Sequence, residues 1–332
     1  MLIWIEFLTI TGLILFSGNR LSRYGDIIAE KTGLSRLWLG MVLMAAVTSL
    51  PELATGLSSV LVAGLPDIAA GDILGSCVFN LAILSIIDAL SKKKPLYSLA
   101  HQGNLLTAGM FMPLISAVGL SLFLGGRVPA LGWFGLTTPL ILAGYLGAMA
   151  LAFRYEKRGS PAAGIHECPA DMYKEIPLKK AVVGYVFNAA VVVGSAIFLP
   201  RIAEGLAEMT GLGRTFVGTI FIALSTSLPE LTVTISSFRL GAVDMAVGNL
   251  FGSNLFNLAI LALDDLFYVR GPLLGDVEPQ HLISVFAIMA MNGLAAAGLI
   301  YRSESKRFLM AWESWAIAAV FVLNLFLLYA LH

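Results

Sequence analysis

The sequence predicts an all-α integral membrane protein with ten transmembrane helices arranged as two inverted five-helix repeats. Three observations support this prediction: an apolar composition, ten separate apolar stretches and an internal duplication. Of the 332 residues, 58% are hydrophobic and 13% charged, whereas about 25% of the residues of a soluble domain are charged. The mean hydropathy of +0.86 also excludes a water-soluble globule. We therefore expect the lipid bilayer to be the solvent of this chain.

Charge and cysteine content exclude two classes of partner. The 21 Lys and Arg residues balance the 21 Asp and Glu residues, so the chain lacks the basic surface that nucleic-acid binding requires. Cys77 lies in an apolar stretch and Cys168 in a polar one, which supports neither a disulfide framework nor a thiolate metal site. We expect no nucleic-acid partner.

Ten apolar stretches are long enough to cross a hydrocarbon core of about 30 Å as helices. They cover residues 2–19, 37–60, 67–90, 103–124, 131–153, 180–200, 215–238, 244–267, 281–301 and 309–331. The first stretch contains Glu6, follows no basic residue and precedes no small-residue cleavage site. It is therefore predicted to be a retained helix and not a signal peptide.

The distribution of Lys and Arg predicts the orientation. The loops after the odd-numbered helices hold 17 of the 21 basic residues, and basic loops stay in the cytoplasm. We therefore expect a multi-pass protein of the cell membrane with both termini extracellular. The predicted units are a first repeat at 1–155, a cytoplasmic linker at 156–178 and a second, inverted repeat at 179–332.

The internal duplication joins two pairs of segments. Residues 33–59 match 211–237 with 13 identities in 27 positions, and 67–88 match 244–265 with 12 identities in 22. Five predicted helices separate equivalent positions, and five is odd, so the second repeat must insert upside down. Inverted repeats of this kind occur in secondary transporters, whose substrate site lies between the repeats near the bilayer midplane.

Each repeat places the same polar group in the middle of its second and third helices. The polar residues are Thr48, Ser49, Glu52, Ser76 and Asn80 in the first repeat, and Thr226, Ser227, Glu230, Ser253 and Asn257 in the second. Pro51 and Pro229 precede the two glutamates and interrupt the helical hydrogen bonding. A carboxylate at the bilayer centre is a functional candidate by default. With no Lys or Arg in these segments, the natural compensation is a bound cation or a proton.

The predicted ligands are all oxygen atoms from carboxylates, hydroxyls, amides and backbone carbonyls. Such a set suits a hard cation such as calcium, whereas zinc or copper would require His or Cys. All four histidines fall in predicted loops or at helix ends. We therefore expect transported calcium and sodium ions and no resident cofactor.

At these residues the sequence resembles the cation/calcium exchanger superfamily, and within it the prokaryotic sodium/calcium exchanger type. The motif TSLPEL occurs at 48–53 and 226–231, and GNLFGSNLFN at 248–257. The resemblance implies a ten-helix antiporter that exchanges calcium for sodium by alternating access. We separately expect the chain to function as a monomer in the bilayer. It also implies that Glu52 and Glu230 are the main shared ligands. The hydroxyl and amide residues given above would complete the sites, and the backbone carbonyls of Ala45 and Ala223 would serve sodium.

Two departures from the family pattern affect the expected site. The family usually has Gly before Thr-Ser, where this chain has Val47 and Ser225, which places easy local unwinding in question. Asn257 stands where potassium-dependent relatives tend to have Asp, which argues against potassium coupling.

The first repeat also differs from the second. Asp72 stands where the second repeat has Asn249, and Cys77 where it has Asn254. Asp72 lies one helical turn before Ser76 on the same face. Two interpretations remain open: a third carboxylate of the ion pathway, or an acid that meets water or a helix terminus near the outer surface.

Two further acids, Asp88 and Asp265, lie near the ends of predicted helices. We expect both to be solvated.

Three other functions compete with sodium/calcium exchange. An intramembrane hydrolase is disfavoured because every Lys and His lies away from the predicted midplane and no H-E-x-x-H motif is present; we expect no enzyme. An ion channel requires weak, multi-site binding, whereas two central carboxylates favour tight coordination. A proton/calcium exchanger remains open, because protons can neutralise glutamates as sodium does.

Overall fold

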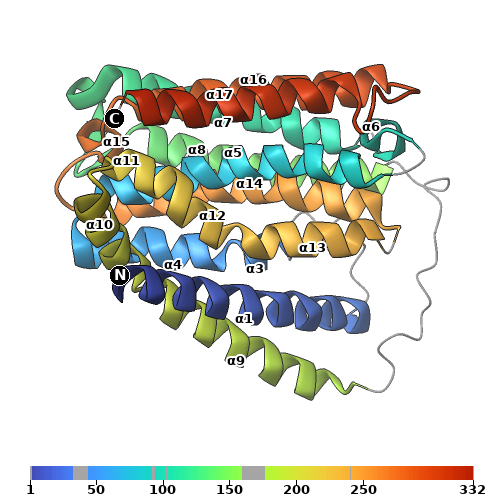
Figure 1. Ribbon diagram of the computed structural model, residues 1–332, viewed down its shortest axis with the longest axis horizontal. Coiled ribbons are helices and arrows are strands. Elements are labelled where there is room, and N and C mark those ends of the chain that lie inside the picture. Colours follow the sequence, from blue (N-terminus) through green and yellow to red (C-terminus); the bar gives the residue numbers. More distant parts are fainter. Residues whose placement is uncertain are drawn as a thin grey trace.

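The computed structural model describes residues 2–32, 44–91, 94–101, 103–158, 176–239 and 241–331. Within these ranges the chain is almost entirely helical, apart from one two-stranded hairpin and an isolated bridge. The long helices lie side by side in one bundle, and both ends of the chain lie at the same end of that bundle (Figure 1).

The first half of the chain contains long helices, short helices and one hairpin. In order, its elements are α1 (Leu2–Thr32), α3 (Ala45–Thr48), α4 (Leu50–Ser58), the π-helical turn η2 (Ser59–Ala63), α5 (Pro66–Leu90), α6 (Leu96–Leu99), α7 (Gly103–Leu124), the 3-10 turn η3 (Gly125–Arg127), strands β1 (Ala130–Leu131) and β2 (Phe134–Gly135), and α8 (Thr137–Arg158). The strands pair antiparallel, with Ala130 opposite Gly135.

The second half repeats the alternation of long and short helices. Its elements are α9 (Leu178–Ala196), α10 (Leu199–Thr210), α11 (Arg214–Val217), the π-helical turn η4 (Gly218–Ile222), α12 (Ala223–Thr226), α13 (Leu228–Arg239), α14 (Val243–Phe267), α15 (Leu273–Asp276), α16 (His281–Tyr301) and α17 (Trp312–Ala330).

Several predicted helix ends are wrong. α1 continues to Thr32 instead of ending at residue 19, because residues 20–32 contain no proline and only one glycine. The predicted helix 180–200 ends as α9 at Ala196, and a second helix, α10, begins at Leu199 with Pro200 in its first turn and continues to Thr210. Of the predicted helix 37–60, residues 37–43 lie outside the described residues.

Seven helices of the described chain are long and apolar enough to cross a membrane, or eight if the bent pair 215–226 and 228–239 is one span. The structure therefore shows an all-α architecture suited to a membrane. α5 and α14 are the most enclosed of these helices, with 78% and 89% of their apolar windows buried.

The two most enclosed helices pack against each other at the centre of the bundle. α5 ends near α6 at one end of the bundle, and α14 ends near α15 at the other, so the two helices run antiparallel (Figure 1). A Cβ atom at Gly71 of α5 would lie 3.1 Å from the Gly218 Cα atom of η4, and one at Gly75 would overlap the Thr219 carbonyl. Glycine at these positions lets α5 approach η4 closely.

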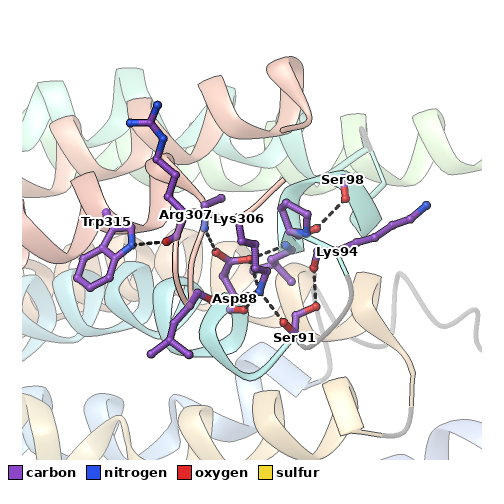
Figure 2. A network of polar contacts seen from close by, with 11 residues as sticks. Asp88, Ser91, Lys94, Ser98, Lys306, Arg307 and Trp315 are labelled. Carbon is purple, nitrogen blue, oxygen red and sulfur yellow. Dashed lines mark hydrogen bonds and ion pairs between the residues drawn. The ribbon is translucent and has the colours of Figure 1, made fainter. Parts of the chain in front are cut away.

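Asp88 anchors two loops at the end of α5. Its carboxylate accepts hydrogen bonds from the Leu96 and Ala311 backbone N–H groups at 2.7 Å each. The Lys306 ammonium lies 3.3 Å from the same carboxylate. Figure 2 shows this group within a network that continues through Ser91. The expectation that Asp88 is solvated is wrong, because its oxygens satisfy buried backbone donors.

Asp265 does the same at the end of α14. Its carboxylate accepts hydrogen bonds from the backbone N–H groups of Leu273 at 2.6 Å and Gly135 at 2.8 Å, and from the Thr138 hydroxyl. It is 4% exposed, so the expectation of a solvated side chain is wrong here as well. Asp88 and Asp265 occupy equivalent repeat positions, and each accepts from the residue eight positions later.

Candidate functional site

Both candidate glutamates follow a break in a helix. Ser49 separates α3 from α4 with φ −89° and ψ 13°, and Ser227 separates α12 from α13 with φ −84° and ψ 0°. The second break bends the chain by 43°. Pro51 and Pro229 lie in the first turn of the helix after each break, where the missing proline N–H is tolerated. The sequence therefore breaks both helices at equivalent points.

The carbonyls next to each break retain one backbone partner. The Ser49 N–H donates to the Ala45 carbonyl at 3.0 Å, and the Ser227 N–H donates to the Ala223 carbonyl at 2.9 Å. The Thr48 hydroxyl lies 3.4 Å from the Ala45 carbonyl oxygen, and the Thr226 hydroxyl lies 3.2 Å from the Ala223 carbonyl oxygen, so each of these two carbonyls also has a side-chain neighbour.

The two repeats exchange hydrogen bonds at the breaks. The Ser49 hydroxyl donates to Glu230 Oε1 at 3.1 Å, and the Ser227 hydroxyl donates to Glu52 Oε1 at 3.5 Å. Each serine thus contacts the glutamate of the other repeat. Both glutamates are 0% exposed, so the structure holds two enclosed carboxylates at the interface between the repeats.

α5 adds a hydroxyl and a third carboxylate. The Ser76 hydroxyl donates to Glu52 Oε1 at 3.1 Å and lies 3.3 Å from the Thr226 hydroxyl. Thr226 donates to Asp72 Oδ1 at 2.8 Å. Asp72 is 0% exposed, so it does not meet water at the surface, and Thr226 connects it to Ser76 of the glutamate group.

The amides of α5 and α14 meet where the two helices cross. Asn80 Nδ2 donates to Asn254 Oδ1 at 3.1 Å, and the Cys77 thiol lies 3.9 Å from the Asn254 carbonyl oxygen. Sequence reasoning noted Asn254 only as the counterpart of Cys77. The side chains of Ser253 and Asn257, one turn apart, have no hydrogen-bond partner in the described chain.

Thr48 completes the group from α3. Its side chain is buried close to Glu230, and its hydroxyl donates to the Met44 carbonyl at 3.0 Å. The hydroxyl oxygen of Thr226, its equivalent, likewise lies 3.2 Å from the Ile222 carbonyl oxygen of its own helix, while its proton is donated to Asp72. The two threonines therefore present their hydroxyl oxygens from equivalent helix turns.

Several oxygens of this group have no hydrogen-bond partner among the described residues. They are Glu52 Oε2, Asp72 Oδ2, Asn80 Oδ1, Glu230 Oε2, Ser253 Oγ and Asn257 Oδ1. Buried polar atoms are normally satisfied, and calcium takes six to eight oxygen ligands in flexible geometry. The described residues contain no cluster of three or more His, Cys, Asp or Glu side chains of the kind that holds a tight metal centre. Chemically, the arrangement suits a hard cation held by mixed carboxylate, hydroxyl and amide oxygens.

Sequence reasoning missed one buried acid, Asp264. It lies beside Asp265 in α14 and is 0% exposed. Its equivalent in the first repeat is Ile87. This mismatch within an otherwise well-matched segment is the signal that could have identified Asp264.

A comparison with protein families matches residues 2–152 and 180–330 to the family described as sodium/calcium exchanger protein. This chain belongs to the sodium/calcium exchanger family. The resemblance inferred from the two motifs is therefore confirmed, and both halves of this exchanger-family chain are included in the match.

Similar proteins cover nearly the whole exchanger-family chain. "Inner membrane protein YrbG" of Escherichia coli (strain K12) is 28% identical over 302 residues, covering 90% of this chain and 89% of that protein. "Sodium/calcium exchanger MaX1" of Methanosarcina acetivorans is 27% identical over 337 residues, covering 91% of each. A solved structure of the sodium-calcium exchanger NCX_Mj, soaked with sodium and calcium, covers 97% of each chain with a TM-score of 0.62 and 20% identity. That likeness supports the fold.

Proposed function

We propose that this exchanger-family protein is a secondary active antiporter that exchanges calcium for sodium by alternating access. The reciprocal contacts of Ser49 with Glu230 and of Ser227 with Glu52 carry the proposal, because they join both repeats in one enclosed anionic site. The free oxygens around this pair support cation coordination. We expect transport and no enzymatic reaction, with the chain functioning as a monomer in the bilayer.

We further propose ten membrane-crossing segments in two inverted repeats, 1–155 and 179–332, joined by a cytoplasmic linker at 156–178, with both termini extracellular. The antiparallel course of α5 and α14 supports the inversion (Figure 1). So do the equivalent helix breaks and the equivalent loop anchors at the ends of these two helices. In such an arrangement, movement of one group of helices exposes a fixed central site to each side in turn.

The negative charge of the site explains why the protein would exchange calcium for sodium instead of carrying both ions together. Glu52 and Glu230 together neutralise one calcium ion and Asp72 adds one further negative charge, so calcium and several sodium ions bound together would still leave positive charge at membrane depth, which is costly. Calcium and sodium should therefore exclude each other. In an empty site, the two enclosed glutamate carboxylates repel each other. The empty protein should therefore switch slowly between exposing the site to one side of the membrane and to the other.

The test is calcium uptake by the purified protein in lipid vesicles, with a sodium gradient and a pH gradient imposed separately. We expect the sodium gradient alone to drive uptake. Uptake driven by the pH gradient alone would instead identify a proton/calcium exchanger. Protein-free vesicles and vesicles containing Glu52→Gln/Glu230→Gln protein serve as controls for leakage.

Calcium binding provides a second measurement of coupling. We expect calcium affinity to fall as sodium rises, because both ions use the same carboxylates. We also expect it to fall with decreasing pH, since a protonated carboxyl group has no negative charge to offer. Calcium affinity that is independent of sodium would contradict the proposed coupling.

A further inference from the structure

The last turns of α14 place a carboxylate inside the bundle, outside the glutamate site. Asp264 is 0% exposed, and neither of its oxygens has a hydrogen-bond partner in the described part of the chain. Its carboxylate lies directly against α4, because a Cβ atom added at Gly56 would overlap both carboxylate oxygens. An unpaired buried carboxylate is costly in a membrane protein and points to a function.

Two hydroxyls and a second carboxylate accompany Asp264. Thr55 Oγ1 and Ser59 Oγ are buried without partners in the described chain, and these two residues lie one helical turn apart and flank Gly56 in the sequence. Asp72 is within electrostatic range of Asp264 and keeps Oδ2 free. These groups offer only oxygen atoms, as a hard cation requires.

The second repeat lacks this arrangement. Asn249, the equivalent of Asp72, donates through Nδ2 to the Thr234 hydroxyl at 3.3 Å, and Thr234 is the equivalent of Gly56. A neutral hydrogen-bonded pair therefore occupies the place where the first repeat leaves room for the Asp264 carboxylate. In the second repeat, the neutral pair fills this space without a buried acid. Packing therefore does not explain why Asp264 is an acid.

We propose that Asp264, the hydroxyls of Thr55 and Ser59, and the free oxygen of Asp72 form a second cation site next to the central one. Asp72 also accepts a hydrogen bond from Thr226 of the glutamate group, so it links the two sites. The second site lies toward the end of the bundle where α14 ends and both chain termini lie (Figure 1). It would load cations from that side only. The identity of the cation rests on the proposed function.

Equilibrium binding of radioactive calcium to the purified full-length protein tests the site. We expect the wild-type protein to bind one calcium tightly and one more weakly, and the Asp264→Asn protein to lose the weaker one. The Glu52→Gln/Glu230→Gln protein should lose the tight calcium and keep the weaker one. Unchanged binding by Asp264→Asn would overturn the second site. Retention of the tight calcium by the double glutamate variant would instead contradict the proposed central site.

A matched variant separates binding from packing. Gly56→Thr combined with Asp72→Asn and Asp264→Ile gives the first repeat the residue types that the second repeat has at the equivalents of these contacts, Thr234, Asn249 and Ile87, so it should fold as a monodisperse protein while lacking the weaker calcium. Thr55→Val retains the shape of the side chain without its hydroxyl and should weaken the second calcium severalfold. If the Gly56→Thr/Asp72→Asn/Asp264→Ile protein bound the weaker calcium, Asp264 would be a packing residue and the proposal would fail.

Sided transport provides a second readout. In vesicles of known protein orientation, Asp264→Asn should raise the half-saturating calcium concentration severalfold when calcium is supplied on the side where α14 ends. Calcium supplied on the opposite side should give the wild-type value. Equal changes on both sides would contradict loading from one side.

Discussion

Glu52 and Glu230 occupy equivalent repeat positions but have different hydrogen-bond environments. Glu52 accepts from Ser76 as well as from Ser227, whereas Ser253, the equivalent of Ser76, has no partner among the described residues. The two repeats therefore share the Glu, Ser and Thr residue types of the site but differ in their contacts and at Asp72, whose equivalent is Asn249. Each glutamate nevertheless supplies half of the negative charge that the pair offers to a divalent ion.

We predict that Glu52→Gln and Glu230→Gln each weaken calcium binding by at least about 100-fold, equivalent to about 2.7 kcal/mol. Each substitution keeps the side-chain shape and removes one negative charge from an enclosed site. Calcium binding and vesicle flux measure the effect. Glu6→Gln, at an exposed position of α1, is the control. Near wild-type flux in either glutamate variant would show that the site is assigned wrongly.

The anchoring acids have a structural role that can be tested separately. We predict that Asp88→Asn destabilises the protein by about 1–3 kcal/mol, because it removes a charged acceptor from two buried backbone N–H groups. Thermal unfolding in detergent measures this loss, and exposed Glu208→Gln is the matched control. Calcium affinity of the folded fraction should not change, and a change would place Asp88 in the ion pathway.

Sequence reasoning at this scale succeeded where the two repeats agree. The duplicated TSLPE segment contains the serines and glutamates that contact each other between the two repeats. Asp264 and Asp265 show its limit. Neighbouring residues on a helix point about 100° apart. Asp265 therefore anchors a loop while Asp264 lies against α4. The packing of the neighbouring helices determines these two roles, and the sequence of α14 alone does not.

At the scale of helices, α1 and α9 pack against each other along one side of the bundle (Figure 1). α1 meets the broken helices through small or polar groups. The Thr11 hydroxyl lies 3.0 Å from the Ser225 hydroxyl, and Gly18 packs on the Pro229 ring. Small side chains let helices approach and shift past one another, so this pair is the natural candidate for the movement that opens the site.

We predict that Gly18→Val slows calcium exchange while leaving calcium affinity close to the wild-type value. A Cβ atom at Gly18 would lie 2.7 Å from Pro229 Cγ, so a branched side chain should obstruct movement of α1 over the break. Gly12→Val is the control, because a Cβ atom there meets nothing within 4 Å. Equal exchange rates for the two variants would argue against movement of α1 at this contact.

Helix existence was easier to predict than helix ends. Hydropathy identifies apolar length, and each predicted span has a helical counterpart in the described residues. It does not identify polar turns that continue a helix beyond the hydrocarbon core, as in α1. Nor did it separate α9 from α10, although Pro200 marks the start of the second helix.

For the whole molecule, the remaining question is orientation in the membrane. We predict that, in a Cys168→Ser protein, Arg127→Cys is labelled by an impermeant thiol reagent only from outside the cell, and Lys180→Cys only from the cytoplasm. Both positions are exposed, and they precede and follow the predicted linker at 156–178. Reversed labelling would show that the topology is inverted and that the second cation site lies on the cytoplasmic side. Labelling of both positions from one side would contradict the predicted topology.

Cys77 gives the enclosed site a natural reporter. Its thiol is fully buried where α5 crosses α14, and the chain has only one other cysteine, Cys168, which lies outside the described residues. In a Cys168→Ser protein, a small methanethiosulfonate should modify Cys77 only during openings of the bundle core. The modification rate would then measure how often each ion opens that core, with the ion-binding residues left unaltered.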